Sequence, residues 1–223
     1  MKIDEFNDSG RRLRRVGVVG DIHCEDEALT LVLRHFSELH IEIVLSVGDI
    51  VDGAGDPNRV CSLLAEHSVL TVLGNHDRWA LHGTMRDLPG ATAIDSLSGG
   101  TRAWLAQLPK TRSFKTAAGP LLLCHGFGTD DMAGLRPDDE GYALRSNLAL
   151  QTLIKEKRYR FVVNGHTHLP MVRNIGRLII INAGTLDRRD RQVCSVIDFD
   201  RGNVELYDVD RSRISKTRCV TMA

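Results

Sequence analysis

Five short apolar segments of this sequence each end in a loop that carries aspartate, asparagine or histidine. In four of these loops a glycine stands directly before the polar residues. The first three apolar segments alternate with helix-length segments, which is typical of parallel strands joined by helices. Loops at the carboxyl ends of such strands meet at one edge of the sheet, so the pattern predicts an α/β fold in which they converge. The loops are GDIH, GDIVDG, GNHD, CHG and GHTH, which begin at residues 20, 48, 74, 124 and 165.

The first half of the chain alternates between expected strands and expected helices. The strand segments are short and rich in valine, isoleucine and leucine, as in a sheet that is buried on both faces. The helical segments space their apolar residues three to four apart, and a proline stands near the start of the second. Strands are expected over residues 15–20, 41–48 and 69–74, and helices over 25–40 and 57–68.

The second half is richer in hairpin patterns. A long polar segment, residues 127–141, is expected to be a loop that could gate a site, because long loops in compact domains are usually functional or mobile. Hairpins are expected over residues 112–126, 171–184 and 192–210, helices near Thr101 and over 142–158, and a strand over 159–168.

The chain is interpreted as one domain with short ends. Residues 1–14 contain the first four residues of RRLRR (residues 11–15) and are expected to form a flexible basic arm, residues 15–210 the domain, and residues 211–223 a polar, frayed C-terminal tail. Lys plus Arg and Asp plus Glu both number 29, so the overall charge favours neither a nucleic-acid nor a membrane partner. Five cysteines without a CxxC pair, and no apolar run of the roughly 18 residues that span a membrane, predict a cytoplasmic protein. The sequence leaves the oligomeric state open.

The polar residues of the five loops are of the types that bind transition metals. Carboxylate, imidazole and amide oxygen groups are ligands for Mn, Fe and Zn, and the lack of clustered thiolates in the sequence disfavours a structural zinc site. In an extended segment side chains two apart point the same way, so Asp21 and His23 could aim at one point. The same spacing holds for His166 and His168. Seven such groups suit two ions about 3.5–4 Å apart that share a bridging carboxylate.

Taken in order, these motifs resemble those of the calcineurin-like metallophosphoesterase superfamily. The ordered set is D-x-H, G-D-x-x-D, G-N-H-D, H-G and G-H-T-H, and the resemblance runs from Val16 to Thr185. It implies a two-sheet α/β/β/α sandwich in a single domain. The short form and GNHDRW look nearer to the small bacterial phosphodiesterase branch than to the Ser/Thr protein phosphatases. Those phosphatases have arginine where this chain has Gly53 and glutamate where it has Asp77.

The resemblance implies a centre of two divalent transition-metal ions, with Mn as the first expectation and Fe, Ni and Zn as alternatives. Each ion would take ligands from early and late loops, and one carboxylate would bridge the pair. The implied ligands are Asp21, His23 and His168 for one ion, Asn75, His125 and His166 for the other, and Asp49 as the bridge.

The resemblance also implies a catalytic histidine outside the metal coordination. His76 would hydrogen-bond the phosphate or protonate the leaving group, and Asp52 would orient His76 and raise its pKa. Asn75 and His76 would contact the substrate. Arg78 directly follows GNHD, and it would either bind a phosphate oxygen of the substrate or remain an ordinary surface arginine.

The implied activity is hydrolysis of phosphodiester or nucleotide-type phosphate esters. Two cations lower the pKa of a bridging water, and the resulting metal-bridging hydroxide would attack phosphorus directly, without a phosphoenzyme. A phosphomonoesterase, including one that acts on phosphoproteins, is the enzymatic alternative. Two alternatives come from other classes: a non-catalytic scaffold of the same fold, as in a retromer subunit, and a nucleic-acid binder that uses RRLRR. Such scaffolds tend to lose ligands or the catalytic histidine, whereas this chain keeps them all.

Overall fold

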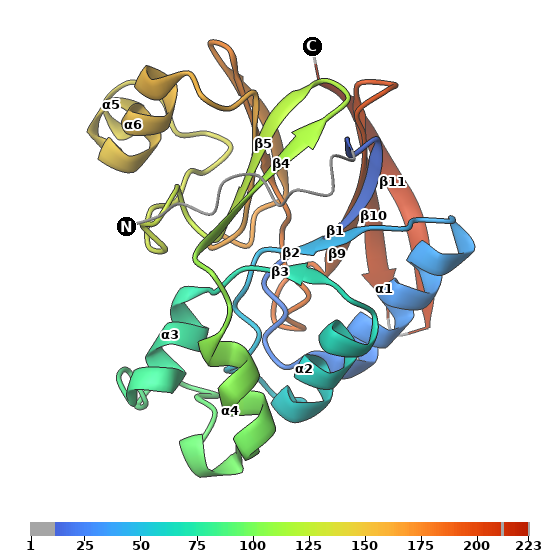
Figure 1. The fold of residues 1–223 in the computed structure, drawn as a ribbon, viewed down its shortest axis with the longest axis vertical. Helices are drawn as coiled ribbons and strands as arrows, with labels where there is room; N and C mark the ends of the chain where they lie inside the picture. Colours follow the sequence, from blue (N-terminus) through green and yellow to red (C-terminus); the bar gives the residue numbers. More distant parts are fainter. Residues whose placement is uncertain (1–11, 211, 223) are drawn as a thin grey trace.

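The computed structural model describes residues 12–210 and 212–222, and it has two β-sheets between layers of helices (Figure 1). The strands are β1 Arg15–Val19, β2 Val44–Ser46, β3 Leu70–Thr71, β4 Thr111–Thr116, β5 Gly119–Cys124, β6 Phe161–Asn164, β7 Met171–Ile175, β8 Leu178–Asn182, β9 Val193–Asp198, β10 Asn203–Asp210 and β11 Arg213–Thr221. The helices are α1 Asp26–Glu38, α2 Pro57–Glu66, α3 Asn75–His82, α4 Gly99–Ala106, α5 Tyr142–Ser146 and α6 Leu148–Glu156, with a 3-10 turn at Ile94–Ser96. Within the described residues, none of the helices is both long enough and apolar enough to cross a membrane.

One sheet has six strands, in the order β11-β10-β9-β1-β2-β3. β1, β2 and β3 are parallel, with Gly17 opposite Val44 and Leu45 opposite Leu70. β9, β10 and β11 extend the sheet beyond β1 as antiparallel neighbours. The parallel strands therefore present their three carboxyl ends at the same edge of this sheet.

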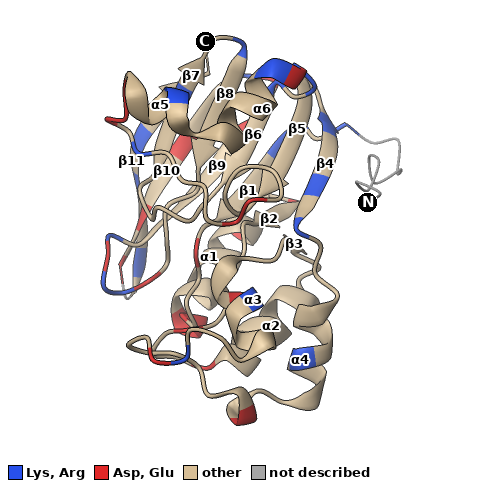
Figure 2. Ribbon diagram, turned by 90° about the vertical axis from the view of Figure 1, so that its left-hand side faces the viewer, with Lys and Arg blue, Asp and Glu red and all other residues tan. Residues whose placement is uncertain are grey.

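The other sheet has five strands, in the order β4-β5-β6-β8-β7. Its three central strands, β5, β6 and β8, are parallel, and the outer strands β4 and β7 run antiparallel to their neighbours. Figure 2 shows α5 and α6 beside this sheet at one end of the molecule and α1 to α4 gathered at the other. Each sheet thus contributes three parallel strand ends to the region where functional loops are expected.

The core is divided into three layers, which explains why the central strands are apolar on both faces. Alternate residues of β1 point to opposite sides: Val18 packs between the two sheets, whereas Val19 packs with residues of α1 and α2. The same alternation in β6 sends Phe161 between the sheets and Val162 toward α6. This arrangement confirms the predicted α/β/β/α sandwich in a single domain.

Local differences from the expected elements lie mostly at polar sequences. The GNHD segment, expected to be a loop, begins α3, and the third strand is limited to Leu70–Thr71. The helix expected over residues 142–158 is divided in two at Asn147, whose side chain accepts the N–H of Leu150 and so caps the second helix. Asparagine and aspartate favour helix starts because their side chains satisfy the first free N–H groups.

The described parts of the two chain ends differ from the expected arm and tail. Most of the expected basic arm, residues 1–11, lies outside the described residues, but Leu13 is buried and its N–H donates to the carbonyl oxygen of Lys115 on β4. The expectation of a frayed tail is wrong for Arg213–Thr221, which forms β11 along β10. Most side chains of β11 are polar and exposed. Backbone hydrogen bonds to β10 hold this edge strand, so it can form without an apolar face. Its sequence therefore lacks the apolar alternation by which a strand is recognised.

Candidate metal centre

The loops predicted to converge do so at the carboxyl ends of the parallel strands of both sheets. Asp21 follows β1, Asp49 follows β2 by a short turn, and Asn75 opens α3 after β3. From the five-stranded sheet, His125 follows β5 and His166 follows β6. We call the seven predicted metal-binding side chains the ligand cluster: Asp21, His23, Asp49, Asn75, His125, His166 and His168.

Much of the backbone at the ligand cluster lies in the left-handed region, which side-chain-bearing residues rarely adopt. His23, Asp49, Asp52, His166 and His168 have φ angles between 46° and 70°. Conformations of this kind persist where the surrounding structure imposes them, and they concentrate at functional sites. The finding corrects the reasoning from extended spacing, because the histidines reach the cluster through left-handed turns.

Two glycines let the loops pack backbone against backbone. A Cβ atom on Gly74 would lie 2.1 Å from Oδ1 of Asp49, and one on Gly53 would lie 1.8 Å from the carbonyl oxygen of His23. These distances are far below van der Waals contact, so any other residue would push the loops apart. The glycines of GDIVDG and GNHD are therefore explained by close approach around the cluster.

One half of the ligand cluster gathers around the side-chain oxygen of Asn75. Nε2 of His125 and Nδ1 of His166 each lie 2.9 Å from this oxygen. Nε2 of His125 also lies 3.2 Å from Oδ2 of Asp49. Asp21 borders this half, because its carboxylate lies 3.4 Å from Nδ1 of His125 and accepts the backbone N–H of His166.

The other half centres on two imidazole rings. Nε2 of His23 lies 3.1 Å from Nε2 of His168 and 3.9 Å from Oδ2 of Asp49. The carboxylate of Asp187 completes the group, since ligand atoms of Asp187 and both histidines lie within 4.8 Å of one another. Asp49 thus faces both halves through one oxygen. Asp21, expected beside His23 and His168, makes its side-chain contacts with the other half.

The hydrogen bonds around the histidines show that the cluster suits cations. Nδ1 of His23 donates to the carbonyl oxygen of Asp52 at 2.8 Å, and Nδ1 of His168 donates to Asp190 at 2.7 Å. The Nε2 atoms of these two rings face each other. His125 repeats the pattern, with Nδ1 donating to the carbonyl oxygen of Val47 and Nε2 facing oxygen atoms. A histidine whose one ring nitrogen donates to an oxygen acceptor while the other faces the cluster is the arrangement usual for metal-binding histidines.

The electrostatics at the centre of the ligand cluster also favour the binding of cations. Burial raises the pKa of Asp49, but the charges and hydrogen bond of the neighbouring histidines outweigh burial and hold that pKa well below its usual range. Burial likewise lowers the pKa of His125, but Asp49 and Asp21 more than offset it and raise the pKa to about 10. The buried carboxylates therefore stabilise positive charge, which is the condition for holding divalent cations.

His76 lies next to the cluster and is held by an acid that is itself held by an arginine. A ring nitrogen of His76 lies within 4.8 Å of ligand atoms of His23 and Asp49, while its Nδ1 lies 2.8 Å from Oδ2 of Asp52. The guanidinium of Arg86 donates to both oxygens of Asp52, each at 2.8 Å. Asp52 thus joins His76 to Arg86, which fixes the plane of the imidazole ring.

The charges of Asp52 and Asp49 favour the protonated form of His76. Burial raises the pKa of Asp52, but hydrogen bonds from His76 and Arg86 and from the backbone lower it to about 2. Burial lowers the pKa of His76, but the hydrogen bond to Asp52 and the charge of Asp49 raise it above its usual value. An ionised acid beside a protonated imidazole is the arrangement expected of a group that gives a proton to a substrate.

Arg78 is paired with the long loop at residues 127–141. Its guanidinium donates to both carboxylate oxygens of Asp131, at 2.6 and 2.9 Å, and the side-chain hydrogen bond raises the pKa of Arg78. Because Arg78 lies on α3 two residues after His76, this ion pair fastens the loop beside the candidate catalytic histidine. Neither sequence alternative for Arg78 included this partner.

Asp77 is a positioning residue to which the sequence reasoning gave no role. Its carboxylate accepts the backbone N–H groups of Gly74, Ile50 and Val51 at 2.8 to 3.2 Å. Burial and the charge of Asp49 raise its pKa to about 6. The side chain joins the loop that carries Asp49 to the start of α3. Its position three residues after Gly74 is a helix-capping signal that could have revealed it.

Three further residues at the site were missed because they act at long sequence distance. Arg86 reaches Asp52 across 34 residues, and it comes from an irregular segment after α3. Asp187 and Asp190 follow β8 in NAGTLDRRDR, and the sequence reasoning did not single out either carboxylate. Asp187 could have been recognised as a candidate ligand, because it is a carboxylate in the loop that follows β8, the sixth parallel strand.

Among curated proteins, the chain is similar to the uncharacterized protein MJ0912 of Methanocaldococcus jannaschii, with 37% identity over 62 residues. This similarity covers 28% of the chain and 26% of that protein, which is about a quarter of the relative's length. Among solved structures, the chain is similar to the hypothetical protein PH1004 from Pyrococcus horikoshii, with a TM-score of 0.74, 17% identity and 88% of each chain covered.

Two other similar structures have names that state a chemistry. The metallophosphoesterase from Sphaerobacter thermophilus matches with a TM-score of 0.66 and 19% identity over 89% of each chain. A novel archaeal phosphodiesterase matches with a TM-score of 0.55 and 14% identity over 87% of this chain and 99% of the other. At these identities the likeness shows a common fold.

The family is shown by the sequence itself. Residues 15–202 match the model of the calcineurin-like phosphoesterase superfamily domain, and this range includes both sheets up to the start of β10 and every residue of the ligand cluster. The chain therefore belongs to the calcineurin-like phosphoesterase superfamily, a family of phosphoester hydrolases that implies divalent metal ions.

Proposed function

We propose that this protein is a dimetal phosphoesterase that hydrolyses phosphodiester or nucleotide-type phosphate esters. The observation that carries the proposal is the position of Asp49. One of its oxygens faces His125 in one half of the ligand cluster and His23 in the other, while its second oxygen accepts the backbone N–H of His76. A carboxylate between two groups of nitrogen and oxygen ligands is suited to bridge two ions.

The ligand cluster would hold the ions by the groups that already converge in it. Asn75, His125 and His166 would hold one ion and His23 and His168 the other. Asp49 would bridge the pair, Asp21 would complete the coordination, and Asp187 lies close enough to His23 and His168 to assist. Bound there, two divalent ions, with Mn as the first choice, would activate water and neutralise charge on the phosphoryl oxygens.

His76 would supply the proton for the leaving group. Its raised pKa favours the protonated ring, and the bond from Nδ1 to Asp52 leaves Nε2 available to the substrate. Protonation of the leaving oxygen by a positioned side chain typically contributes about 10² to 10⁴ in rate. Arg86 would act through Asp52, by holding that carboxylate in place.

The charges of the arginines around the ligand cluster support a phosphodiester substrate over a phosphomonoester. Arg78, Arg86 and Arg189 are each paired with a carboxylate, so their charges are already balanced. A phosphate monoester carries close to two negative charges at neutral pH, whereas a diester carries one. Arginines that are already paired with carboxylates stabilise a bound dianion less than unpaired arginines would. The similarity to an archaeal phosphodiesterase agrees with this preference.

A comparison of two chromogenic esters tests the proposal. Hydrolysis of bis-p-nitrophenyl phosphate and of p-nitrophenyl phosphate would be measured with Mn²⁺, with other divalent ions and with a chelator. We expect metal-dependent turnover of both, with the higher kcat/KM on the diester. A higher value on the monoester would favour the phosphomonoesterase alternative. Metal binding without turnover of either ester would favour the non-catalytic scaffold.

The cysteines support a reducing location for this activity. All five are free thiols, and four of them are buried. Free thiols persist in reducing compartments, so we place the activity in the cytoplasm as part of the same proposal.

A further inference from the structure

A cavity of about 380 Å³ lies at the end of the five-stranded sheet opposite the ligand cluster. It opens between the carboxyl-terminal end of α6 and the turn that joins β7 to β8. Arg160, which lines it, directly precedes β6, whereas His166 follows β6 at the other end. The four residues of β6 separate the two regions by about 13 Å at the usual rise of a strand. We call this space the distal cavity.

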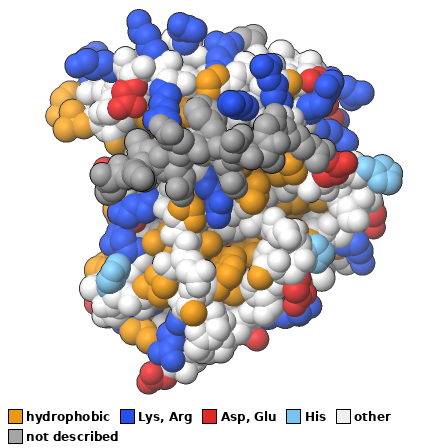
Figure 3. Space-filling view, in the orientation of Figure 1, with side chains coloured by type: hydrophobic (Ala, Val, Ile, Leu, Met, Phe, Trp, Pro, Cys, Tyr) orange, Lys and Arg blue, Asp and Glu red, His pale blue; other side chains and the backbone are white. Residues whose placement is uncertain are grey.

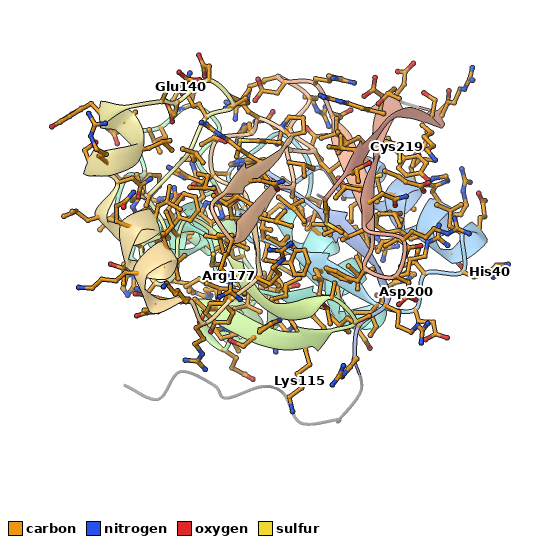
Figure 4. The ribbon with its side chains drawn as sticks, turned by 90° about the horizontal axis from the view of Figure 1, so that it is seen from above. His40, Lys115, Glu140, Arg177, Asp200 and Cys219 are labelled. Atoms are coloured by element: carbon orange, nitrogen blue, oxygen red, sulfur yellow. The ribbon has the colours of Figure 1, made fainter. Side chains whose placement is uncertain are left out.

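The distal cavity is lined by four cationic side chains, Lys157, Arg158, Arg160 and Arg177, and by no Asp or Glu among the described residues. Figure 3 shows lysine and arginine side chains gathered along the upper end of the molecule, and Figure 4, seen from that end, labels Arg177 there. Lys157, Arg160 and Arg177 form no ion pair with any carboxylate in the described part of the chain. Their positive charges are therefore available to an anionic ligand.

The remaining walls of the distal cavity are apolar. Leu153, Leu178 and the ring of Tyr159 are buried there, and the guanidinium of Arg158 lies 5.3 Å from the centre of that ring. Tyr159 is fixed by a hydrogen bond of 2.8 Å to Ser113, so this wall is rigid. A second cavity of about 270 Å³ shares Leu153, Arg158 and Tyr159 and reaches Phe127, with Asp130 and Glu156 also in its lining. Apolar walls with a few charged groups at the rim are typical of sites for small organic ligands.

We propose that the distal cavity binds a small organic phosphate with a flat apolar body, of about the size of a nucleoside monophosphate. Its volume lies within the range of about 300–1,000 Å³ that is usual for ligand pockets. Arg160 and Arg177 would hold the phosphate, because guanidinium groups match phosphate oxygens in geometry and charge. The apolar walls would hold the body. This inference does not depend on the proposed function, because it uses none of the residues of the ligand cluster.

Amide NMR of the full chain, loaded with a diamagnetic divalent ion and titrated with AMP, tests the proposal. We expect the amide of Gly176, in the β7–β8 turn, to shift saturably with AMP. Inorganic phosphate should bind at least about tenfold more weakly, because it lacks the apolar body. The double variant Arg160→Gln/Arg177→Gln should weaken the Kd for AMP at least about tenfold, since one charged hydrogen bond contributes about 1.5–3 kcal/mol and 1.4 kcal/mol is a factor of ten. The single variant Arg177→Gln at an exposed position should weaken it in the same direction.

The matched control is Arg201→Gln, which removes an exposed arginine from the β9–β10 turn of the other sheet and should leave the Kd unchanged. Hydrolysis of bis-p-nitrophenyl phosphate should stay within about twofold of wild type in all variants, which also shows that they fold. The proposal is overturned if Gly176 does not shift, if the arginine variants bind AMP as the control does, or if phosphate binds as tightly as AMP. Failure of hydrolysis in every protein would overturn the proposed function and leave the binding result standing.

Discussion

The two ends of the five-stranded sheet carry positive charge in opposite ways. Beside the ligand cluster, Arg78 and Arg86 each lie against a carboxylate that holds them in place. At the distal cavity, Lys157, Arg160 and Arg177 have no carboxylate partner among the described residues. The first end combines buried acids with histidines and suits metal cations, whereas the second combines unpaired cations with apolar walls and suits an organic anion.

The overall charge of the chain does not reveal this difference between the two ends. Lys plus Arg balance Asp plus Glu over the whole chain, and that balance favours neither a nucleic-acid nor a membrane partner. The balance is an average over two ends of opposite character. Because charges in water interact mainly within about 10 Å, each end acts on its ligands almost independently of the other. Changes at one end should therefore leave the other end largely unaffected.

The largest expected effect comes from Asp49→Asn. The substitution keeps the size of the side chain but removes the charge that faces both halves of the ligand cluster. We expect kcat/KM on bis-p-nitrophenyl phosphate to fall by on the order of a thousandfold, the upper range for loss of one electrostatic stabiliser. Metal content measured by elemental analysis should fall as well. Asp138→Asn in the exposed loop is the control, and an equal loss in that variant would contradict the account.

The next largest effect should come from His76→Ala. Loss of the proton donor should lower kcat about a hundredfold or more, and the loss should be greater for esters with poor leaving groups than for p-nitrophenyl esters. His82→Ala is the matched control, because His82 is exposed on the same helix. Equal losses for good and poor leaving groups would rule out His76 as the acid.

A pH profile of Asp52→Asn separates proton donation from simple positioning. His76 has its pKa raised partly by Asp52, so activity that needs the protonated ring is present at low pH and lost as pH rises through that pKa. Without the charge of Asp52 the pKa of His76 falls, so the alkaline limb of kcat/KM should move to lower pH. We also expect about a tenfold to hundredfold lower maximum, by analogy with the loss that is typical when a carboxylate that orients a metal-binding histidine is removed. An unmoved limb would contradict the role of Asp52.

A smaller effect is expected from Arg86→Gln, which leaves Asp52 without its bidentate partner. Loss of one charged hydrogen bond, about 1.5–3 kcal/mol, should reduce kcat about tenfold. Arg86→Lys should restore part of the rate, because it returns the charge without the two-pronged geometry. Arg102→Gln, at an exposed position of α4, should have no effect. If Arg86→Gln and Arg102→Gln behave alike, Arg86 does not position Asp52.

The smallest effect should be that of metal removal on the affinity of the distal cavity for AMP. A chelator should abolish hydrolysis and leave the affinity of the distal cavity for AMP within about twofold, because β6 separates the two regions. The same NMR titration at Gly176, with and without chelator, measures this. A large loss of AMP affinity on chelation would mean that the two ends are coupled or that AMP binds at the metals.

The fold and most of the ligand cluster could be predicted because the signals are local. Each of the five loops follows an apolar segment, and parallel strands bring such loops together whatever their distance in sequence. Gly48 and Asp49, for example, mark the end of β2 within a few residues. The reason given for His23 and His168 was incomplete, since left-handed turns rather than extended spacing direct their side chains.

The features that escaped prediction depend on long-range contacts or on backbone pairing. Arg86 meets Asp52 only because the segment after α3 folds back, and nothing near Arg86 in the sequence indicates this. β11 is an edge strand whose polar residues look like a tail. The distal cavity joins Arg160 and Arg177 from two separate turns, each of which resembles an ordinary solvated surface when read alone.

The most direct test of the dimetal centre is a crystal structure of the Mn²⁺-loaded protein, with anomalous diffraction recorded at the manganese absorption edge. The account predicts two peaks about 3.5–4 Å apart, with Oδ2 of Asp49 between them and His125 and His23 on opposite sides. A single peak, or two peaks that do not share Asp49, would contradict it.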